Sequence, residues 1–157
     1  MVGIDDIQKF FFKAMQQNGY SSGGQKITIP SMPGYKAIPF REGDFSLLDC
    51  WCTTPHSQKS AGTTTIFYKD SPVWWMQYNG WYTEEAISFL KLALSKTAET
   101  QEWLGGRGPK EFTDGRLVYR NDPRINDFAG FNGYECIIYR NRLGHLGYHE
   151  YSGFLLI

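Results

Sequence analysis

The sequence predicts an α+β fold, in which a mainly antiparallel, meandering sheet is joined by an N-terminal helix and one inserted helix that packs on it. Aromatic residues make up 17% of the 157 residues, and their large side chains favour strands and sheet-rich cores. Seventeen Gly and seven Pro indicate many turns, as antiparallel strands require. Two stretches, near residues 4–15 and 83–96, instead space their apolar side chains as helices do.

Length and composition indicate one domain, spanning residues 1–157. The shares of hydrophobic (41%) and charged (20%) residues fit a globular chain better than a disordered or membrane-spanning one. The sequence has no run of about 18 apolar residues, and its first 15 residues lack the basic flank of a signal peptide. Cys50, Cys52 and Cys136 make a poor disulfide framework because their number is odd. We therefore expect reduced thiols, a cytoplasmic location and no membrane contact.

The first predicted element is a helix that begins near Ile4 and carries acidic residues in its first turn, where the helix dipole favours them. Asn18 and Gly19 supply a left-handed stop. The turn-rich residues 21–34 then predict a loop with one short strand around Ile27.

Strands are expected in the middle of the chain. Residues 45–52 carry apolar groups on both faces, which suggests an inner strand covered on both sides. Residues 63–69 and 73–79 flank the turn sequence Asp70-Ser71-Pro72 and predict a hairpin, whose second strand closes at Asn79-Gly80.

The second predicted helix follows Thr83, a suitable N-cap residue. Its apolar stripe has strict helical spacing and comprises Ala86, Phe89, Leu90, Ala93 and Leu94. The helix should end near Lys96 or fray toward Leu104, since the glycines and proline of residues 105–109 cannot continue it.

The last third returns to strands. A hairpin is expected at Asp114-Gly115 within residues 111–120, followed by a loop over residues 121–133. Residues 134–140 and 143–151 should then pair, with a final strand over residues 154–157.

Two motifs in this region resemble functional sites, but the residues around them argue against those functions. His145 and His149 have the spacing of a helical zinc pair, but the residues around them predict a strand, on which the rings would lie roughly 13 Å apart. We expect two surface-facing histidines, no metal and no other cofactor. Residues 105–108 (Gly-Gly-Arg-Gly) suggest a phosphate-binding loop, yet they follow a helix and precede no Lys-Ser/Thr pair. A helix stop explains them.

Charged groups in apolar strands are stronger candidates for a site. Asp49 interrupts the apolar face of a strand that a compact charged turn, Arg41 to Asp44, introduces. A buried carboxylate needs a partner, which Arg41 or a backbone donor could supply. The alternative is that Asp49 faces an aromatic-lined pocket.

Glu135 raises the same question at the head of the strand over residues 134–140. If Asp49 and Glu135 approached each other, the two carboxylates could perform acid/base chemistry. Their separation does not follow from the sequence.

Short motifs spread over nearly the whole chain resemble a bacterial family of unknown function. They are Tyr20-x-x-Gly23-Gly24, Arg41-Glu42-Gly43-Asp44-Phe45-x-x-x-Asp49, Ile66-x-Tyr68-x-x-x-Pro72-Val73-Trp74-x-Met76-x-Tyr78-x-Gly80, Phe89-Leu90-Lys91-x-Ala93-Leu94, Arg107-Gly108-Pro109 and Phe131-x-Gly133-Tyr134-Glu135-x-Ile137-x-Tyr139. Members of that family occur alone and as the C-terminal part of regulators that begin with an XRE-type helix-turn-helix. One N-terminal helix cannot make a helix-turn-helix, so the resemblance implies an effector or interaction module. It implies no catalytic residues.

Two classes of function are consistent with these observations. The first is a non-catalytic module that binds a small molecule or a protein partner, with a homodimer as one form of the latter. Its pocket residues would be Arg41, Asp44, Asp49, Trp74, Tyr78 and Glu135. The second is an enzyme that uses carboxylates in an aromatic-lined pocket. Equal numbers of basic and acidic residues, 16 of each, argue against a nucleic-acid partner.

Overall fold

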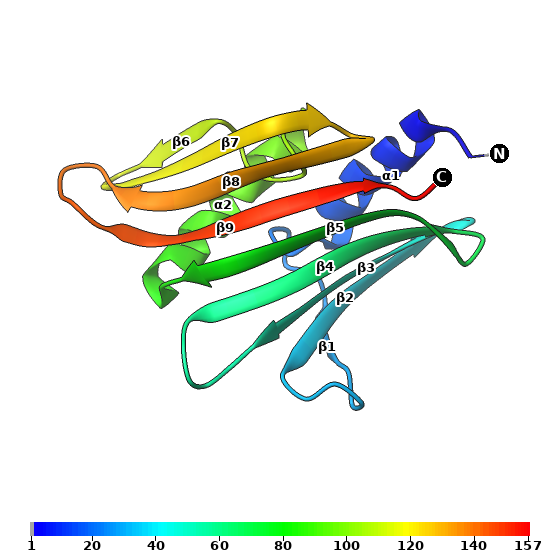
Figure 1. Ribbon diagram of the computed structural model, residues 1–157, viewed down its shortest axis with the longest axis horizontal. Coiled ribbons are helices and arrows are strands. Elements are labelled where there is room, and N and C mark those ends of the chain that lie inside the picture. The colour runs from blue at the N-terminus through cyan, green and yellow to red at the C-terminus, as the bar shows by residue number, and fades with distance from the viewer. Residues whose placement is uncertain (1) are drawn as a thin grey trace.

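The structure, a computed structural model, describes residues 2–157 as one nine-stranded sheet with two helices on one of its faces (Figure 1). The elements in chain order are α1 (Ile4–Asn18), β1 (Ile27–Thr28), β2 (Tyr35–Glu42), β3 (Phe45–Thr53), β4 (Lys59–Tyr68), β5 (Ser71–Tyr82), α2 (Glu84–Thr100), β6 (Glu111–Asp114), β7 (Leu117–Asp127), β8 (Gly130–Tyr139) and β9 (His145–Leu155). The strands lie in the order β1-β2-β3-β4-β5-β9-β8-β7-β6, and every neighbouring pair is antiparallel. The predicted α+β fold is confirmed.

Helix α1 packs on the sheet through a stripe that contains Ile7, Phe10 and Phe11, all buried. It ends at Asn18, as predicted, but the predicted left-handed stop is wrong. Gly19 is extended, with φ −77° and ψ 170°, and the left-handed conformation occurs later, at Gly23 with φ 78°. The chain therefore turns back toward the sheet over several residues.

Helix α2 buries Ala86, Phe89 and Leu90 in a cluster with side chains of β7, β8 and β9. It runs to Thr100, between the two ends that the sequence suggested, and Gln101 makes the left-handed cap by donating its N–H to the carbonyl oxygen of Thr97. Thr83 precedes the helix, but its side chain makes no capping hydrogen bond.

Strands β5, β7, β8 and β9 each run past a boundary that the sequence predicted. The expected loop over residues 121–133 is wrong, since β7 and β8 pair through most of it. The pairing register shifts between Pro123 and Ile125, and such a bulge accommodates a proline within a sheet. Likewise, β5 continues past Gly80 to Tyr82, and β9 runs unbroken to Leu155.

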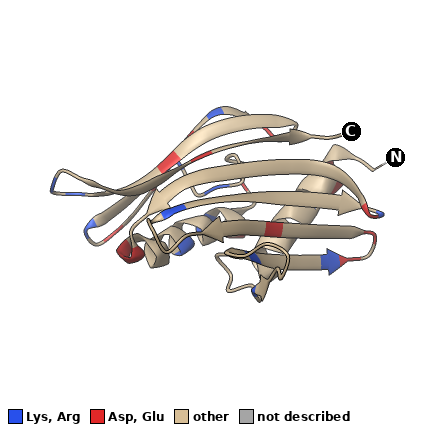
Figure 2. Ribbon diagram, turned by 60° about the horizontal axis from the view of Figure 1, so that its bottom comes forward, with Lys and Arg blue, Asp and Glu red and all other residues tan. Residues whose placement is uncertain are grey.

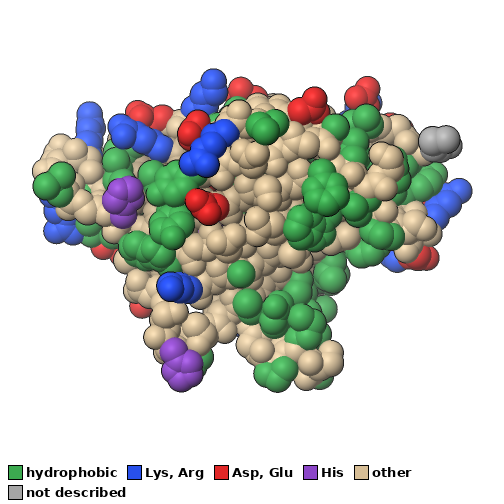
Figure 3. All heavy atoms as spheres, viewed as in Figure 1, with side chains coloured by type: hydrophobic (Ala, Val, Ile, Leu, Met, Phe, Trp, Pro, Cys, Tyr) green, Lys and Arg blue, Asp and Glu red, His purple; other side chains and the backbone are tan. Residues whose placement is uncertain are grey.

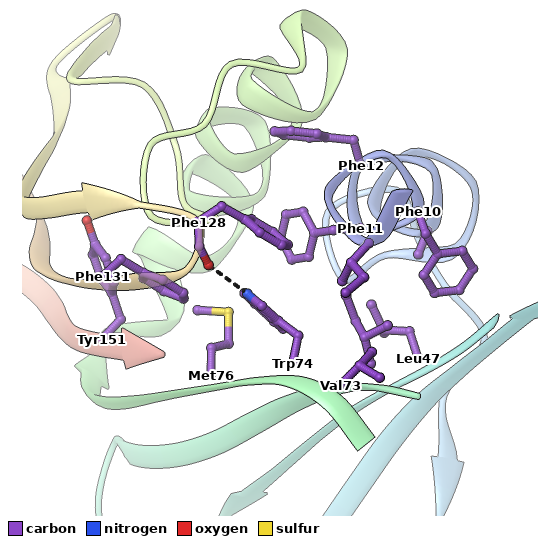
Figure 4. Close-up of a cluster of buried hydrophobic side chains, with 13 residues drawn as sticks. Phe10, Phe11, Phe12, Leu47, Val73, Trp74, Met76, Phe128, Phe131 and Tyr151 are labelled. Atoms are coloured by element: carbon purple, nitrogen blue, oxygen red, sulfur yellow. Dashed lines mark hydrogen bonds between the residues drawn. The ribbon is translucent and has the colours of Figure 1, made fainter. Parts of the chain in front are cut away.

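The main core lies between α1 and the sheet (Figure 4). Trp74 is fully buried there, stacked between Phe128 and Phe131 at ring-centroid distances of 5.4 and 5.6 Å. Its indole N–H donates to the carbonyl oxygen of Phe128 at 3.2 Å, so its polar atom is satisfied. Aromatic content of the chain thus serves core packing to a large extent.

The other face of the sheet carries no helix, which corrects the expectation that residues 45–52 are covered on both sides (Figure 1). Hydrophobic side chains gather there in separate groups with polar surface between them (Figure 3). Aromatic side chains on adjacent strands partly bury one another on this face, as Trp75 does with Phe154 and Tyr134 with Tyr148. Charged residues lie mostly near turns, strand ends and the helices (Figure 2). The opposite, helix-covered face of the sheet contains a cavity.

Candidate ligand-binding site

A cavity of about 180 Å³ lies between the two helices and the sheet. Its apolar side, called the roof below, is formed by α1 and α2 through Phe11, Phe12, Met15, Ile87, Leu90 and Leu94. The opposite side, called the floor, consists of sheet residues and includes Asp49, Ser60, Thr64, Met76, Tyr78 and His149. One side of the cavity is therefore apolar, whereas the other carries ionisable and hydroxyl groups.

Strand register places these polar groups on one face. Ser60, Gly80, His149 and Glu135 stand directly opposite one another across β4, β5, β9 and β8. Gly80 has no side chain, and a Cβ there would lie 3.0 Å from the His149 ring. The missing side chain lets His149 reach across β5 to Ser60.

Glycines also make room for tyrosines on this face of the sheet, Tyr78 in the floor and Tyr151 in the core beside it. A Cβ at Gly62 would lie 2.5 Å from the Tyr78 ring, and one at Gly133 would lie 2.2 Å from the Tyr151 hydroxyl. Each tyrosine thus lies flat over a glycine of the neighbouring strand instead of standing upright. Tyr78 thereby reaches from β5 across β4 to Asp49 on β3.

Asp49 is buried, and one of its carboxylate oxygens, Oδ1, accepts two hydrogen bonds. Tyr78 donates at 2.8 Å and Thr64 at 3.0 Å. Burial raises the pKa of Asp49 above its ordinary value of 3.8, although both hydrogen bonds and the charge of Arg107 oppose the change. No basic side chain among residues 2–157 forms an ion pair with it. Asp49 is thus a buried acid without a paired cation.

Glu135, in contrast, is fully buried and fully paired. Arg107 donates to its Oε1 in a short ion pair, and Tyr119 donates to Oε2 at 2.5 Å. Burial alone would raise the pKa of Glu135, but Arg107 and His149 lower it from 4.5 to about 2. Burial lowers the pKa of Arg107, but the charge and hydrogen bond of Glu135 raise it by more, so the pKa of Arg107 lies above its ordinary value. Both groups are charged at neutral pH.

His149 lies between Glu135 and Ser60. Its Nδ1 is 3.4 Å from Glu135 Oε1 and 3.5 Å from an Arg107 nitrogen, and its Nε2 is 3.3 Å from Ser60 Oγ. Burial lowers the pKa of His149 below 6.5, although Glu135 opposes this change. The imidazole is therefore neutral at pH 7. It is 6% exposed, so the expectation of a surface-facing histidine is wrong here, while His145 is exposed.

Arg107 comes from the glycine-rich loop after α2, and side chains from the sheet hold that loop in place. Asn121 donates to the carbonyl oxygens of Leu104 and Gly108, and Tyr151 in turn donates to Asn121 at 2.6 Å. The guanidinium, 10% exposed, lies over Tyr78 with its Cζ 5.3 Å from the ring centroid. Arg107 and Asp49 therefore both contact Tyr78.

Several polar atoms of the cavity wall have no hydrogen-bond partner. They are Arg107 Nε, Thr97 Oγ1 and the Tyr82 hydroxyl, each inaccessible to solvent. A buried polar group that makes no hydrogen bond is destabilising, and an unpaired group in a native protein commonly marks a position for water or a ligand.

Aromatic and basic residues surround the cavity beside the roof. Tyr20 and Trp51 line it, with their rings in edge contact at 5.6 Å. Lys91 and Lys26 lie over Tyr20, with Nζ 4.9 and 5.6 Å from the ring centroid. Burial, Lys91 and Lys36 lower the pKa of Lys26, as expected when like charges gather.

The structure brings some of the predicted site residues together and separates others. Asp49 and Tyr78 line the cavity, and Glu135 lies behind Arg107. Trp74 belongs to the core. Arg41 and Asp44 lie at exposed positions around the β2–β3 turn, where they pair with Asp70 and Lys69. Within the described part of the chain, neither of the two partners expected for Asp49, Arg41 or a backbone donor, binds it, since the hydroxyls of Tyr78 and Thr64 take that place.

Asp49 and Glu135 do not form a carboxylate pair. Strands β4, β5 and β9 separate β3 from β8, which is roughly 19 Å along a sheet of ordinary spacing. Each carboxylate has its own set of hydrogen-bond donors. Two carboxylates that share a proton are therefore absent from this site.

Sequence reasoning missed Arg107 and His149. Arg107 stands among glycines that a helix stop explained fully, and His149 was expected, like His145, to face the surface from a strand. A usable signal was present, because His149 alternates with Gly147 and Tyr151, both buried in β9. That period of two places His149 on the buried face.

Within residues 2–157, no three His, Cys, Asp or Glu side chains come close enough to hold a metal ion. The two described helices are too short or too polar to cross a membrane.

The fold and the cavity define an α+β protein with a mixed polar and apolar internal site. The chain belongs to a family described as a domain of unknown function, DUF5680, which matches residues 56–154. The matched region includes Ser60, Tyr78, Arg107, Glu135 and His149, whereas Asp49 and α1 precede it. No curated protein and no solved structure matches the chain.

Proposed function

We propose that this protein is a non-catalytic module that binds a small molecule in the cavity between the helices and the sheet. The observation that carries the proposal is the division of that cavity into an apolar roof and a floor with a buried, unpaired Asp49. Ligand sites in proteins commonly combine apolar walls with a few convergent polar groups.

The polar atoms without partners support this function. Burying a polar group without a hydrogen bond is destabilising by about 1–3 kcal/mol, so a stable fold tolerates few of them. Three such atoms belong to residues around this one cavity: Arg107, Thr97 and Tyr82. A molecule in the cavity would reach them only if these side chains rotate on binding, and such a rearrangement would offset the destabilisation.

The biological setting is part of the proposal. The resemblance described above implies a bacterial family that also occurs beside XRE-type DNA-binding domains, and the expected reduced thiols favour a cytoplasmic location. Ligand occupancy would then be the signal that such a module passes to a protein partner. The uncovered face of the sheet, with its aromatic groups, is available for a partner or a second copy.

Native mass spectrometry of freshly purified protein, compared with its denatured mass, tests the proposal. We expect a constant non-covalent excess mass on a fraction of the molecules. Leu94→Trp should abolish it by filling the cavity from a half-buried roof position. Leu92→Trp, on the exposed side of the same helix, is the matched control. An excess mass that persists in Leu94→Trp would place the ligand elsewhere. A bare dimer would favour protein interaction instead.

A second candidate function is hydrolysis of an acyl compound, favoured by the contacts Ser60–His149–Glu135. With Nδ1–H directed at Glu135, His149 Nε2 could take the Ser60 proton as Oγ bonds to the acyl carbon. The proton would then leave with the departing alcohol, and water would release the acyl group. Ser60→Ala should lower p-nitrophenyl acetate hydrolysis by about 100-fold or more, and the exposed Ser57→Ala should not. Equal rates for wild type and Ser60→Ala would eliminate this candidate.

A further inference from the structure

The ionisable groups of the cavity restrict the charge of its ligand. Glu135 pairs with Arg107 through Nη2 and leaves the guanidinium against Tyr78, while Asp49 has hydroxyl donors and no cation. A cationic ligand could pair with Asp49, but it would lie close to Arg107, which also contacts Tyr78. Lys26 and Lys91 beside Tyr20 add further positive charge around the cavity. Like charges this close are destabilising in a poorly solvated site.

An anionic ligand meets the opposite difficulty. It would be attracted by the lysines, but within the cavity it would lie beside the Asp49 carboxylate. The carboxylate is buried with only neutral hydroxyl partners, so a second negative charge would require its protonation. A neutral molecule avoids both penalties.

The hydrogen-bonding groups of the cavity that remain unpaired indicate which donors and acceptors the ligand carries. Asp49 Oδ1 accepts from Thr64 and Tyr78, and its second oxygen accepts from no side chain within residues 2–157. Arg107 donates through Nη2 to Glu135, whereas its Nη1 donates to no residue within 2–157 and, unlike Nε, is not sealed from solvent. The cavity thus offers one free acceptor and one free donor, both against Tyr78.

We infer that the ligand is a neutral, planar ring compound in which an N–H donor adjoins a carbonyl acceptor, as in a cyclic amide or one edge of a nucleobase. Its N–H donates to the free oxygen of Asp49, and its carbonyl accepts from Arg107. This inference rests on the proposed binding function and adds the chemical class of the ligand.

Size and the roof agree with a flat compound of one or two rings. An apolar cavity of about 150 Å³ holds benzene, and this one measures about 180 Å³. Phe12, Leu90 and Leu94 present an apolar surface to the ring. A long chain or a phosphate would not fit in about 180 Å³ together with the rings, so such groups would have to extend past Tyr20 toward the lysines.

Titration calorimetry with matched two-ring compounds tests the inference. The probes are carbostyril, which carries the adjacent N–H and C=O, its N-methyl derivative, quinoline, naphthoate and naphthylmethylammonium. We expect carbostyril to bind about tenfold or more tightly than either the N-methyl derivative, which lacks the N–H, or quinoline, which lacks both the N–H and the carbonyl. The two charged probes should bind more weakly than carbostyril as well.

Asp49→Asn tests the assignment of the donor. The asparagine oxygen can still accept from Thr64 and Tyr78, but the free edge becomes an NH₂ donor. Carbostyril should lose about tenfold or more in affinity, while the N-methyl derivative should change little. Asp44→Asn, at the exposed β2–β3 turn, is the matched control. Thermal unfolding of each variant shows whether it is folded, and the probe series on the wild type stands without the variant.

The outcomes separate this inference from the proposed function. Preference for naphthoate, naphthylmethylammonium or N-methyl carbostyril, lost in Leu94→Trp, would overturn the ligand class and keep the binding function. Equal binding of carbostyril to wild type and a folded Asp49→Asn would also overturn the ligand class. No binding of any probe, together with no excess mass in native spectrometry, would overturn both.

Discussion

Arg107 and Glu135 form an ion pair inside the protein, and they connect the loop after α2 to the sheet. Glu135 is 0% exposed and divides its carboxylate between Arg107 and Tyr119. Water cannot replace a lost partner at this depth. Removing one member of a buried pair therefore leaves an uncompensated charge, whereas an exposed pair has solvent as a substitute.

Glu135→Gln should lower the free energy of unfolding by about 3–5 kcal/mol, because the Arg107 charge stays buried without its partner. Urea denaturation at pH 7 measures the loss. Glu111→Gln is the matched control, since Glu111 pairs with Arg120 at the surface and its removal should change stability by about 0–1 kcal/mol. A loss for Glu135→Gln within the range of the control would contradict the assigned ion pair.

Single residues differed in how far the sequence could place them. Asp49 and Glu135 were conspicuous because each interrupts an apolar strand, and both are buried. The residues that pair with them could not be predicted in this way. Arg107 lies 28 residues from Glu135, and the loop that carries it is fixed by Asn121 and Asn126 from the far half of the sheet. Such long-range pairing follows from strand order, which local patterns do not contain.

At the scale of elements, periodicity predicted both helices and most strands. Where it failed, turn-forming residues stood inside a strand. Pro123 fits β7 because the register shifts there, and Gly80 fits β5 because a Cβ would lie 2.0 Å from the carbonyl oxygen of Tyr148. In both cases a residue that normally ends a strand instead shapes it, for reasons that lie in the neighbouring strand.

Neighbouring strands also shape the helix-covered face of the sheet, including the part of the floor that Tyr78 forms. Period-two alternation assigns a residue to a face, but it does not say which residue stands opposite. Gly62 opposes Tyr78, and Gly133 opposes Tyr151, so each ring lies down across a glycine. Without the register, these glycines predict only turns or weak strands. The roof was easier to predict from the sequence, because each helix carries its apolar residues at regular spacing within one continuous segment.

At the scale of the whole molecule, the buried side chains of Asp49, Glu135 and His149 make the free energy of unfolding depend on pH. Their contributions do not all change in the same direction as the pH falls. The pKa of Glu135 is lowered from 4.5 to about 2, so its contribution to stability is present above pH 4.5 and is lost as the pH falls toward 2. The pKa of His149 is lowered below 6.5, and its contribution likewise decreases as the pH falls below 6.5. The pKa of Asp49 is raised above 3.8, so its contribution is present at low pH and decreases as the pH rises.

Asp49→Asn isolates the contribution with the opposite sign. In the unfolded chain Asp49 loses its proton above about pH 4, whereas burial delays this loss in the folded protein. The ionised wild type is thereby destabilised relative to a neutral asparagine. The stability of Asp49→Asn should therefore rise relative to the wild type as the pH increases from about 4 to about 8.

Urea midpoints of the two proteins across this range measure the difference. Glu135 and His149 are present in both, so their contributions cancel. The trend should persist in about 0.5 M salt, because a buried charge is screened far less than an exposed one. A difference that stays constant with pH would mean that Asp49 titrates alike in the folded and unfolded chains. The carboxylate would then lack the desolvated environment on which the cavity's preference for a neutral donor depends.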